Sequence, residues 1–284
     1  EGQMSALGRI KEGVILRVAA SELSGTLPVM QVSDNLTFLA EVMIEQAIAV
    51  ARAQLVQRYG EPQAKQVGFA VMAYGKLGGI ELSYGSDLDL VFVFNGADGQ
   101  TAGPKVIDNS RFYTRLAQRV THVLSAQMFS GRLYEVDLRL RPDGDSGLVA
   151  TTLTGFRRYQ LESAWTWEHQ ALCRARFILG CHELLECFTA VRLTVLSKPR
   201  ILLELASEVV SMREKMRAHL AKGDTENIDL KQDAGGVADI EFIVQFLLLA
   251  HTNAFPSLAK WPDNVRILAN LARLSLITKA EADI

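Results

Sequence analysis

Two apolar runs on either side of a glycine-rich turn constrain the fold of this chain more than any other feature. The first run is Phe69–Tyr74, the turn is Gly75–Gly79, and the second run is Leu88–Phe94, which begins next to Asp87. Side chains two residues apart on a strand point to the same face, so Asp87 and Asp89 would lie side by side where the second strand begins. Two carboxylates about 5 Å apart repel by roughly 3 kcal/mol at an effective dielectric of 20. A divalent cation such as Mg²⁺ commonly offsets this repulsion, so we expect a metal site at the mouth of the strand.

A further strand is predicted at Leu133–Leu140, ahead of an Arg-Pro-Asp-Gly turn. Period two places Glu135, Asp137, Arg139 and Arg141 on one face of this strand. If that face meets the two aspartates of the first motif, three carboxylates and two arginines come together.

This combination fits nucleotidyl transfer. Two Mg²⁺ ions roughly 3.5–4 Å apart can clamp the attacking and leaving oxygens of an in-line displacement, and the acids would hold them. Guanidinium groups bind phosphate oxygens bidentately, and glycines let backbone N–H groups approach a phosphate. Gly75, Lys76, Arg139 and Arg141 are therefore candidates for binding a triphosphate, and Ser86, next to Asp87, is a further candidate for phosphate contact.

Each part has a simpler interpretation when it is taken alone. An isolated Asp-x-Asp pair is usually a solvated edge, and the two arginines could form a solvated face. The glycine turn matches neither GxxxxGK[ST] nor GxGxxG and could be only a tight connection. A glycine turn, then SDLDL, then an acid on a distant strand is nevertheless the pattern of the polymerase-β-like nucleotidyltransferases.

The predicted elements divide the chain into an α/β part and a helical part. A long helix is expected from Ser33 or Asn35 to about Arg58, with Ser33 and Asp34 as N-caps, and another over Asn109–Met128. After about residue 150 the strand signals fade, and helices are predicted at Thr154–Leu161, Ala164–Leu179, His182–Leu196, Ile201–Leu220, Gly236–His251 and Asp263–Leu274. The predicted class is α+β, with a helical lead-in (1–27), a nucleotidyltransferase domain of a small mixed sheet with flanking helices (28–150), and a helical bundle (151–284).

Composition excludes several classes of protein. A net charge of -2 gives no general attraction to nucleic acid or anionic membrane, and no apolar window of about 18 residues predicts a membrane span. Cys173, Cys181 and Cys187 show no CxxC spacing, so we expect reduced thiols in a cytoplasmic protein rather than disulfides or zinc. The chain starts without Met and stops inside a predicted helix, which indicates a fragment of a longer protein.

Two other segments have open roles. In Lys231–Phe242, Gly235 and Gly236 precede a helix that has Asp239 and Glu241 in its first turns, where carboxylates favour the positive end of the helix. Alternatively, this loop borders the nucleotide site or contacts a partner protein.

Trp165 and Trp167, beside Glu168 and His169, cannot share one face of a helix because they are two residues apart. We expect one of them in the core and the other at a cleft or an interface. The sequence assigns no role to Glu168.

Seven blocks occur in an order that resembles the glutamine synthetase adenylyltransferase family. They are AYGKLGGIELSYGSDLDLVFVF, RFYTRLAQRV, GRLYEVDLRLRPDGDSGLV, SAWTWEHQALCRAR, MREKMRAHL, IDLKQDAGGVADIEF and WPDNVRIL. The resemblance covers nearly the whole chain. It implies that Asp87 and Asp89 match the metal-binding pair and that Asp137 matches the third carboxylate.

Members of this family have two homologous nucleotidyltransferase halves. One half adds AMP to a tyrosine of glutamine synthetase, and the other removes it by phosphorolysis. AWTWEHQALCRAR, TLPVMQVSDNLTFLAE and MREKMRAHL resemble the adenylylating, C-terminal half. The resemblance also implies ATP as substrate, two Mg²⁺ ions, glutamine synthetase as protein partner, and regulation of the full-length enzyme by glutamine and the PII signal protein. Two alternatives stay open: the deadenylylating half, and a non-catalytic module that binds glutamine synthetase or PII.

Overall fold

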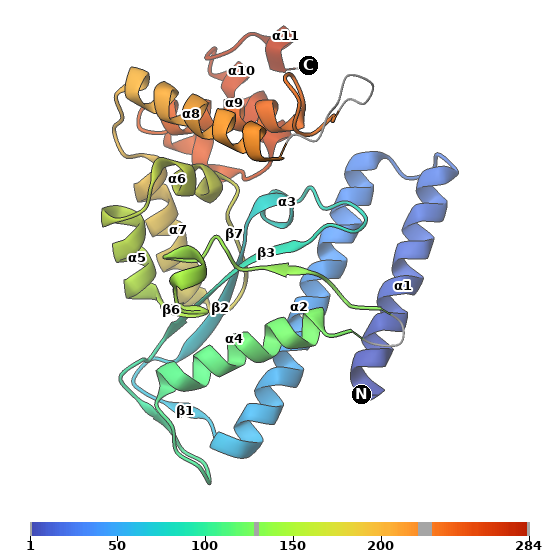
Figure 1. Ribbon diagram of the computed structural model, residues 1–284, viewed down its shortest axis with the longest axis vertical. Coiled ribbons are helices and arrows are strands. Elements are labelled where there is room, and N and C mark those ends of the chain that lie inside the picture. Colours follow the sequence, from blue (N-terminus) through green and yellow to red (C-terminus); the bar gives the residue numbers. More distant parts are fainter. Residues whose placement is uncertain (1, 128–130, 221–228, 283–284) are drawn as a thin grey trace. The chain divides into compact units, whose positions relative to one another are not determined.

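The computed structural model describes residues 2–127, 131–220 and 229–282 (Figure 1). The chain divides into two compact units, Glu1–Tyr159 with Ala175–Thr189, and Gln160–Arg174 with Ala190–Ile284. The first unit contains a mixed sheet with helices, and the second is built from helices. The α+β class is thus confirmed, whereas the domain limits at residues 27 and 150 stay predictions.

The main sheet of the first unit is centred on two antiparallel strands. It contains β2 (Gly68–Ala73), β3 (Leu88–Asn95), β5 (Val136–Asp137), β6 (Ala150–Thr152) and β7 (Arg176–Leu179). The order is β5-β3-β2-β7; β7 pairs antiparallel with β2, and β5 and β6 both pair parallel with β3. β5 lies along the start of β3 and β6 along its end, so the chain between them leaves the sheet and returns to it.

Three helices of this unit contribute to its core. α1 (Gly2–Leu23), α2 (Val29–Tyr59) and α4 (Asn109–Ser125) bury apolar side chains together with Leu88, Leu90, Phe92 and Phe94 of β3. Because these β3 residues alternate along the strand, Asp87 and Asp89 lie on the opposite face. The face of β3 that packs on the helices therefore leaves both acids on the other side of the sheet.

Helix α2 begins earlier than the sequence indicated. It starts at Val29, and Val32 N donates to Pro28 O at 3.0 Å, so Ser33 and Asp34 lie inside the helix rather than capping it. Proline fixes φ near the helical value, which makes it a good residue at a helix start. Helix α4 is confirmed but ends at Ser125, because Ala126 is extended; the predicted end at Met128 itself falls outside the described residues.

The expected absence of strands after residue 150 is wrong. The helix predicted over Ala164–Leu179 ends at Cys173, and the next residues form β7, which pairs with β2. A short apolar run such as Phe177–Leu179 has no periodicity that separates strand from helix. Pairing with a strand distant in sequence decides its structure.

The second unit contains α6 (Thr166–Cys173), α8 (Leu202–Leu220), α9 (Val237–His251), α10 (Asn264–Arg273) and α11 (Lys279–Ala282). Its core gathers leucine and valine side chains of α8, α9 and α10. α5 (Leu153–Glu162) and α7 (His182–Leu196) contribute residues to both units, and the remaining short elements are β1 (Pro62–Gln63), α3 (Gly75–Gly78), β4 (Gln100–Thr101), η1 (Gly144–Ser146) and η2 (Pro256–Lys260). None of the helices within the described ranges is long and apolar enough to cross a membrane.

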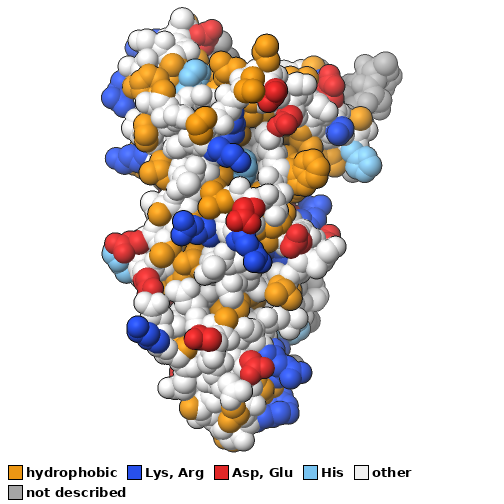
Figure 2. All heavy atoms as spheres, turned by 90° about the vertical axis from the view of Figure 1, so that its left-hand side faces the viewer, with side chains coloured by type: hydrophobic (Ala, Val, Ile, Leu, Met, Phe, Trp, Pro, Cys, Tyr) orange, Lys and Arg blue, Asp and Glu red, His pale blue; other side chains and the backbone are white. Residues whose placement is uncertain are grey.

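Both tryptophans near the start of α6 are exposed. The exposed fraction is 72% for Trp165 and 37% for Trp167, so the expectation that one of them lies in the core is wrong. Glu168 and His169 are buried instead, because Glu168 caps the helix through Trp165 N and His169 Nε2 contacts Gln160 O at 3.0 Å. Figure 2 shows one face of the molecule, on which hydrophobic side chains are exposed beside charged ones.

Candidate active site

Strand pairing brings Asp89 and Asp137 together. In the parallel pair of β3 and β5, Leu88 is opposite Val136 and Asp89 is opposite Asp137, and Leu88 N donates to Glu135 O at 2.9 Å. Residues in register on neighbouring strands point to the same face, about 4.7–4.9 Å apart along the hydrogen-bonding direction. A carboxylate from a distant part of the sequence thus joins the pair at the start of β3.

The glycine turn packs directly on one of these carboxylates. It forms the single-turn helix α3, and Gly75 has φ +54°, a left-handed conformation that suits glycine. A Cβ added at Gly75 would overlap Oδ2 of Asp89, while Tyr74 N donates to Asp89 O at 2.9 Å. Asp89 is therefore fixed between the turn on one side and β5 on the other.

The loop from α3 to β3 links Lys76 to Ser86. Lys76 Nζ donates to Ser83 Oγ at 3.2 Å, and Ser83 Oγ lies 2.9 Å from Ser86 Oγ. Ser83 N also donates to Ser86 Oγ at 3.2 Å. Two predicted phosphate-binding residues thus lie in one hydrogen-bonded chain directly before Asp87.

Asp87 and Asp137 line the same open hollow, which has a volume of about 490 Å³. The Asp87 side chain is exposed. The other charged residues that line this hollow are Glu135, Arg139, Arg141 and Asp145. Acids and arginines from β3, β5 and the loop after β5 thus face one volume.

The Asp137 carboxylate is held by Arg139. Its Oδ1 accepts from Arg139 N at 2.8 Å, and its Oδ2 accepts from Nε at 2.8 Å and from a second guanidinium nitrogen. Burial alone would raise the pKa of Asp137, but the hydrogen bonds and charge of Arg139, together with the charge of Arg141, hold this pKa below its usual value. Asp137 is therefore an ionised carboxylate at neutral pH.

The predicted third strand is much shorter than expected, and this changes the position of its arginines. β5 ends at Asp137, and Arg141 N donates to Leu138 O at 3.1 Å in a turn, so the expectation that Arg139 and Arg141 share a strand face with Asp137 is wrong. The Arg141 guanidinium donates to the carbonyl oxygens of Leu138, Asp145 and Gly147 at 2.8, 3.0 and 3.3 Å. Arg141 therefore organises the loop between β5 and β6.

The three aspartates offer oxygen ligands, which Mg²⁺ prefers. Asp89 and Asp137 share a face, and Asp87 and Asp137 share a hollow. Within the described part of the chain, however, no three His, Cys, Asp or Glu side chains are grouped closely enough to hold a metal ion. The oxygen ligands thus suit Mg²⁺ in their chemistry, and the sheet brings Asp89 opposite Asp137, but the described acids do not form a three-ligand cluster and Asp137 is engaged by Arg139.

Sequence reasoning missed Arg176. From β7, its Nε donates to Gly78 O at 3.1 Å, one terminal nitrogen donates to Leu77 O at 3.0 Å, and it pairs with Glu41 at 2.5 Å. Arg176 thus holds the carbonyl end of the glycine turn. The Arg-Ala-Arg sequence was visible, but its assignment to a helix hid this contact.

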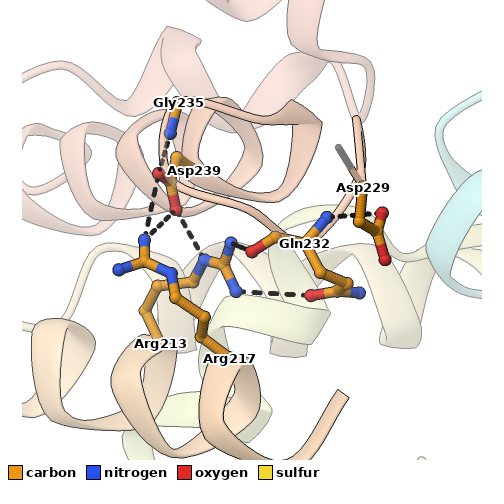
Figure 3. A network of polar contacts seen from close by, with 6 residues as sticks. All are labelled: Arg213, Arg217, Asp229, Gln232, Gly235 and Asp239. Carbon is orange, nitrogen blue, oxygen red and sulfur yellow. Dashed lines mark hydrogen bonds and ion pairs between the residues drawn. The ribbon is translucent and has the colours of Figure 1, made fainter. Parts of the chain in front are cut away.

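In the helical unit, the Lys231–Phe242 segment is fixed by arginines of α8 (Figure 3). Asp239 accepts from Gly235 N at 2.7 Å, from Arg213 Nε at 2.6 Å and from Arg217 at 3.0 Å. The Gly235 N–H and then the two arginines hold the pKa of Asp239 below its usual value. Glu241 pairs with Arg174 at 2.8 Å, so both acids near the start of α9 have structural partners in their own unit.

Two family models match the chain in succession. Residues 1–191 match the family described as glutamate-ammonia ligase adenylyltransferase, and residues 210–284 match the family described as GlnD PII-uridylyltransferase.

Curated relatives agree with the first match. The chain is 51% identical to a bifunctional glutamine synthetase adenylyltransferase/adenylyl-removing enzyme from Shewanella loihica and 50% identical to the protein of that name from Shewanella oneidensis, over 99% and 98% of its length. The aligned region covers 30% of each relative, so the chain spans about a third of their length. Because the first family model covers well over half of the residues, the chain belongs to the glutamate-ammonia ligase adenylyltransferase family.

Proposed function

We propose that this chain transfers AMP from ATP to a tyrosine hydroxyl of glutamine synthetase and releases pyrophosphate. The observation that carries this proposal is the register of β3 and β5, which puts Asp89 opposite Asp137 at the end of the strand where Asp87 lies. Family membership supports the reaction class, and the names of the relatives support the acceptor. We assign the sheet to the polymerase-β-like nucleotidyltransferase fold on the same grounds.

In this mechanism Asp87 and Asp89 would share one role, as ligands of both metal ions. Asp137 would hold the catalytic ion and accept the proton of the attacking hydroxyl. A free tyrosine has a pKa near 10, so the hydroxyl must lose its proton as it attacks the α-phosphorus. Bound Mg²⁺ supplies charge that stabilises the phosphoryl oxygens and the attacking oxygen.

The glycine turn and the loop that follows it bind the triphosphate. Because Gly75 has no side chain, the backbone of the turn lies close to the Asp89 carboxylate. Lys76 and Ser86 belong to the hydrogen-bonded chain that leads to Asp87. Arg139 and Arg141 are the remaining candidates, because both line the same hollow as Asp87 and a guanidinium can bind phosphate bidentately.

Replacing the acids tests the proposal. Asp87→Asn and Asp89→Asn should each lower AMP transfer to glutamine synthetase on the order of 100-fold or more, because a metal ligand is lost. Asp98→Asn is the matched control, since Asp98 is an exposed acid in a turn of the same unit. Near wild-type turnover by both site variants would rule out the two-metal mechanism.

The adenylyl-removing reaction is the second candidate, because the name of the relatives joins both activities. Incubation with adenylylated glutamine synthetase and phosphate distinguishes them, since release of ADP would assign the chain to that half. A non-catalytic module would bind ATP equally well with and without Mg²⁺ in calorimetry. Regulation of the full-length protein by glutamine and PII is proposed from the resemblance alone.

A further inference from the structure

Arg139 already provides a cation at the acid site. Its backbone N–H and its guanidinium engage both oxygens of the Asp137 carboxylate. Asp137 is one of the acids assigned above to a metal ion, so one side chain occupies the oxygens that a metal would need.

Other carboxylates surround the same guanidinium. Asp145 and Asp87 line the same hollow as Arg139, and Asp89 lies opposite Asp137 in the sheet. The guanidinium thus offsets part of the negative charge at the place where a divalent cation would be held.

The two partners of this ion pair differ in their freedom to move. The exposed fraction is 73% for the Arg139 side chain and 14% for the Asp137 side chain. Asp137 is fixed by its pairing with Asp89 in the sheet, whereas Arg139 lies in the turn after β5. Because most of the Arg139 side chain is already in water, the guanidinium can leave without losing a buried environment and without disturbing the strand.

We propose that Arg139 is a resident counter-cation that exchanges with the metal ion: it pairs with Asp137 when no divalent cation is bound and moves to the nucleotide phosphates when one binds. This inference rests on the metal site of the proposed function. The exchange couples metal binding to nucleotide binding, because the released guanidinium gains a phosphate partner only when nucleotide is present. Metal alone must displace Arg139, whereas metal with nucleotide gives Arg139 a new partner.

Mn²⁺ binding measured by electron paramagnetic resonance tests the exchange. Without nucleotide, Arg139→Ala should bind Mn²⁺ on the order of five-fold more tightly than the wild type, as expected when one exposed ion pair no longer competes. With a non-hydrolysable ATP analogue, the same variant should bind the analogue more weakly and lose most of the coupling between the two ligands. These two effects have opposite signs, which a misfolded site would not produce.

Arg132→Ala is the matched control, because it removes an arginine of the same segment whose partner is the exposed Glu135. Its Mn²⁺ affinity should stay within about two-fold of the wild type, since this pair is screened by solvent. An equal gain of affinity in Arg132→Ala would reduce the effect to general electrostatics and overturn the exchange.

The remaining outcomes separate this inference from the proposed function. Unchanged or weaker Mn²⁺ binding in Arg139→Ala, with Asp89→Asn still abolishing it, would overturn the exchange and leave the metal site intact. Equal Mn²⁺ binding by the wild type and Asp89→Asn, or none by either protein with the ATP analogue, would overturn the metal site and the exchange with it.

Discussion

Asp239 and Asp137 are both held by arginine side chains, and these arginines differ in their exposure to solvent. Asp239 binds Arg213, whose side chain is 7% exposed, and also binds Arg217 and the backbone of Gly235. Asp137 binds Arg139, whose side chain is 73% exposed. Both interactions lower the pKa of the acid, but Arg213 is buried whereas Arg139 is largely in water and stays solvated when its ion pair opens. An aspartate–arginine pair is thus a fixed structural contact in the helical unit, and in the unit that contains the sheet it is a contact that can exchange.

The largest expected effect is on the free energy of unfolding, when the ion pair of Asp239 with the buried Arg213 is broken. Asp239→Ala leaves Arg213 buried without its carboxylate, and removal of one partner of a buried pair costs about 3 kcal/mol or more. Trp165, Trp167 and Trp261 all lie in the helical unit, so denaturant unfolding followed by tryptophan fluorescence reports on that unit. Arg217→Ala, at a more exposed partner, should cost less. Equal, small losses of stability in both variants would show that the ion pair of Asp239 and Arg213 is not buried in solution.

The strands that carry the acids could be predicted from the sequence only in part. The apolar run Leu88–Phe94 predicted β3, and the acid on the third predicted strand proved to be the partner of Asp89 in register. The extent of that strand was wrong because the Asp137 side chain accepts from Arg139 N, and such local bonds compete with strand pairing.

Long-range contacts set the rest. The sequence shows Asp239 at the start of a helix but not the arginines that bind it, because they come from α8. The contact of Arg176 with the glycine turn depends on the pairing of β7 with β2, which no local pattern specifies. α7, by contrast, begins and ends where its sequence predicted.

A second test concerns Asp89, the acid against which the glycine turn packs. Gly75→Ala would place a Cβ against Asp89 Oδ2 at a positive φ, so we expect a loss of about 2 kcal/mol in stability and most of the AMP transfer. Gly85→Ala is the control, because Gly85 also has a positive φ but nothing lies within 4 Å of its added Cβ. It should lose about 1 kcal/mol and keep its activity. Equal activity of the two variants would separate Asp89 from the chemistry.

The exposed pair should matter much less for stability. Arg139→Ala should lower the free energy of unfolding by less than about 1 kcal/mol, because a solvent-exposed ion pair is screened and flexible. Thermal unfolding followed by circular dichroism measures this difference against Asp239→Ala. A loss as large as that of Asp239→Ala would make Arg139 a structural residue and remove the contrast between the two pairs.

The smallest expected effect is the titration of Asp137 itself. Burial raises the pKa of this acid and Arg139 lowers it, so Arg139→Ala should move the pKa upward while the pKa of Asp239 stays unchanged. A lowered pKa stabilises the fold above the unfolded value, about 3.9, and this contribution is lost as the pH falls through the folded value. The variant therefore lacks only a small part of its stability above about pH 4. Carbon NMR of aspartate carboxyls, with Asp239 as the internal reference, measures both titrations. A shift of both acids would mean that Arg139 acts through the whole fold rather than on the carboxylate that it binds.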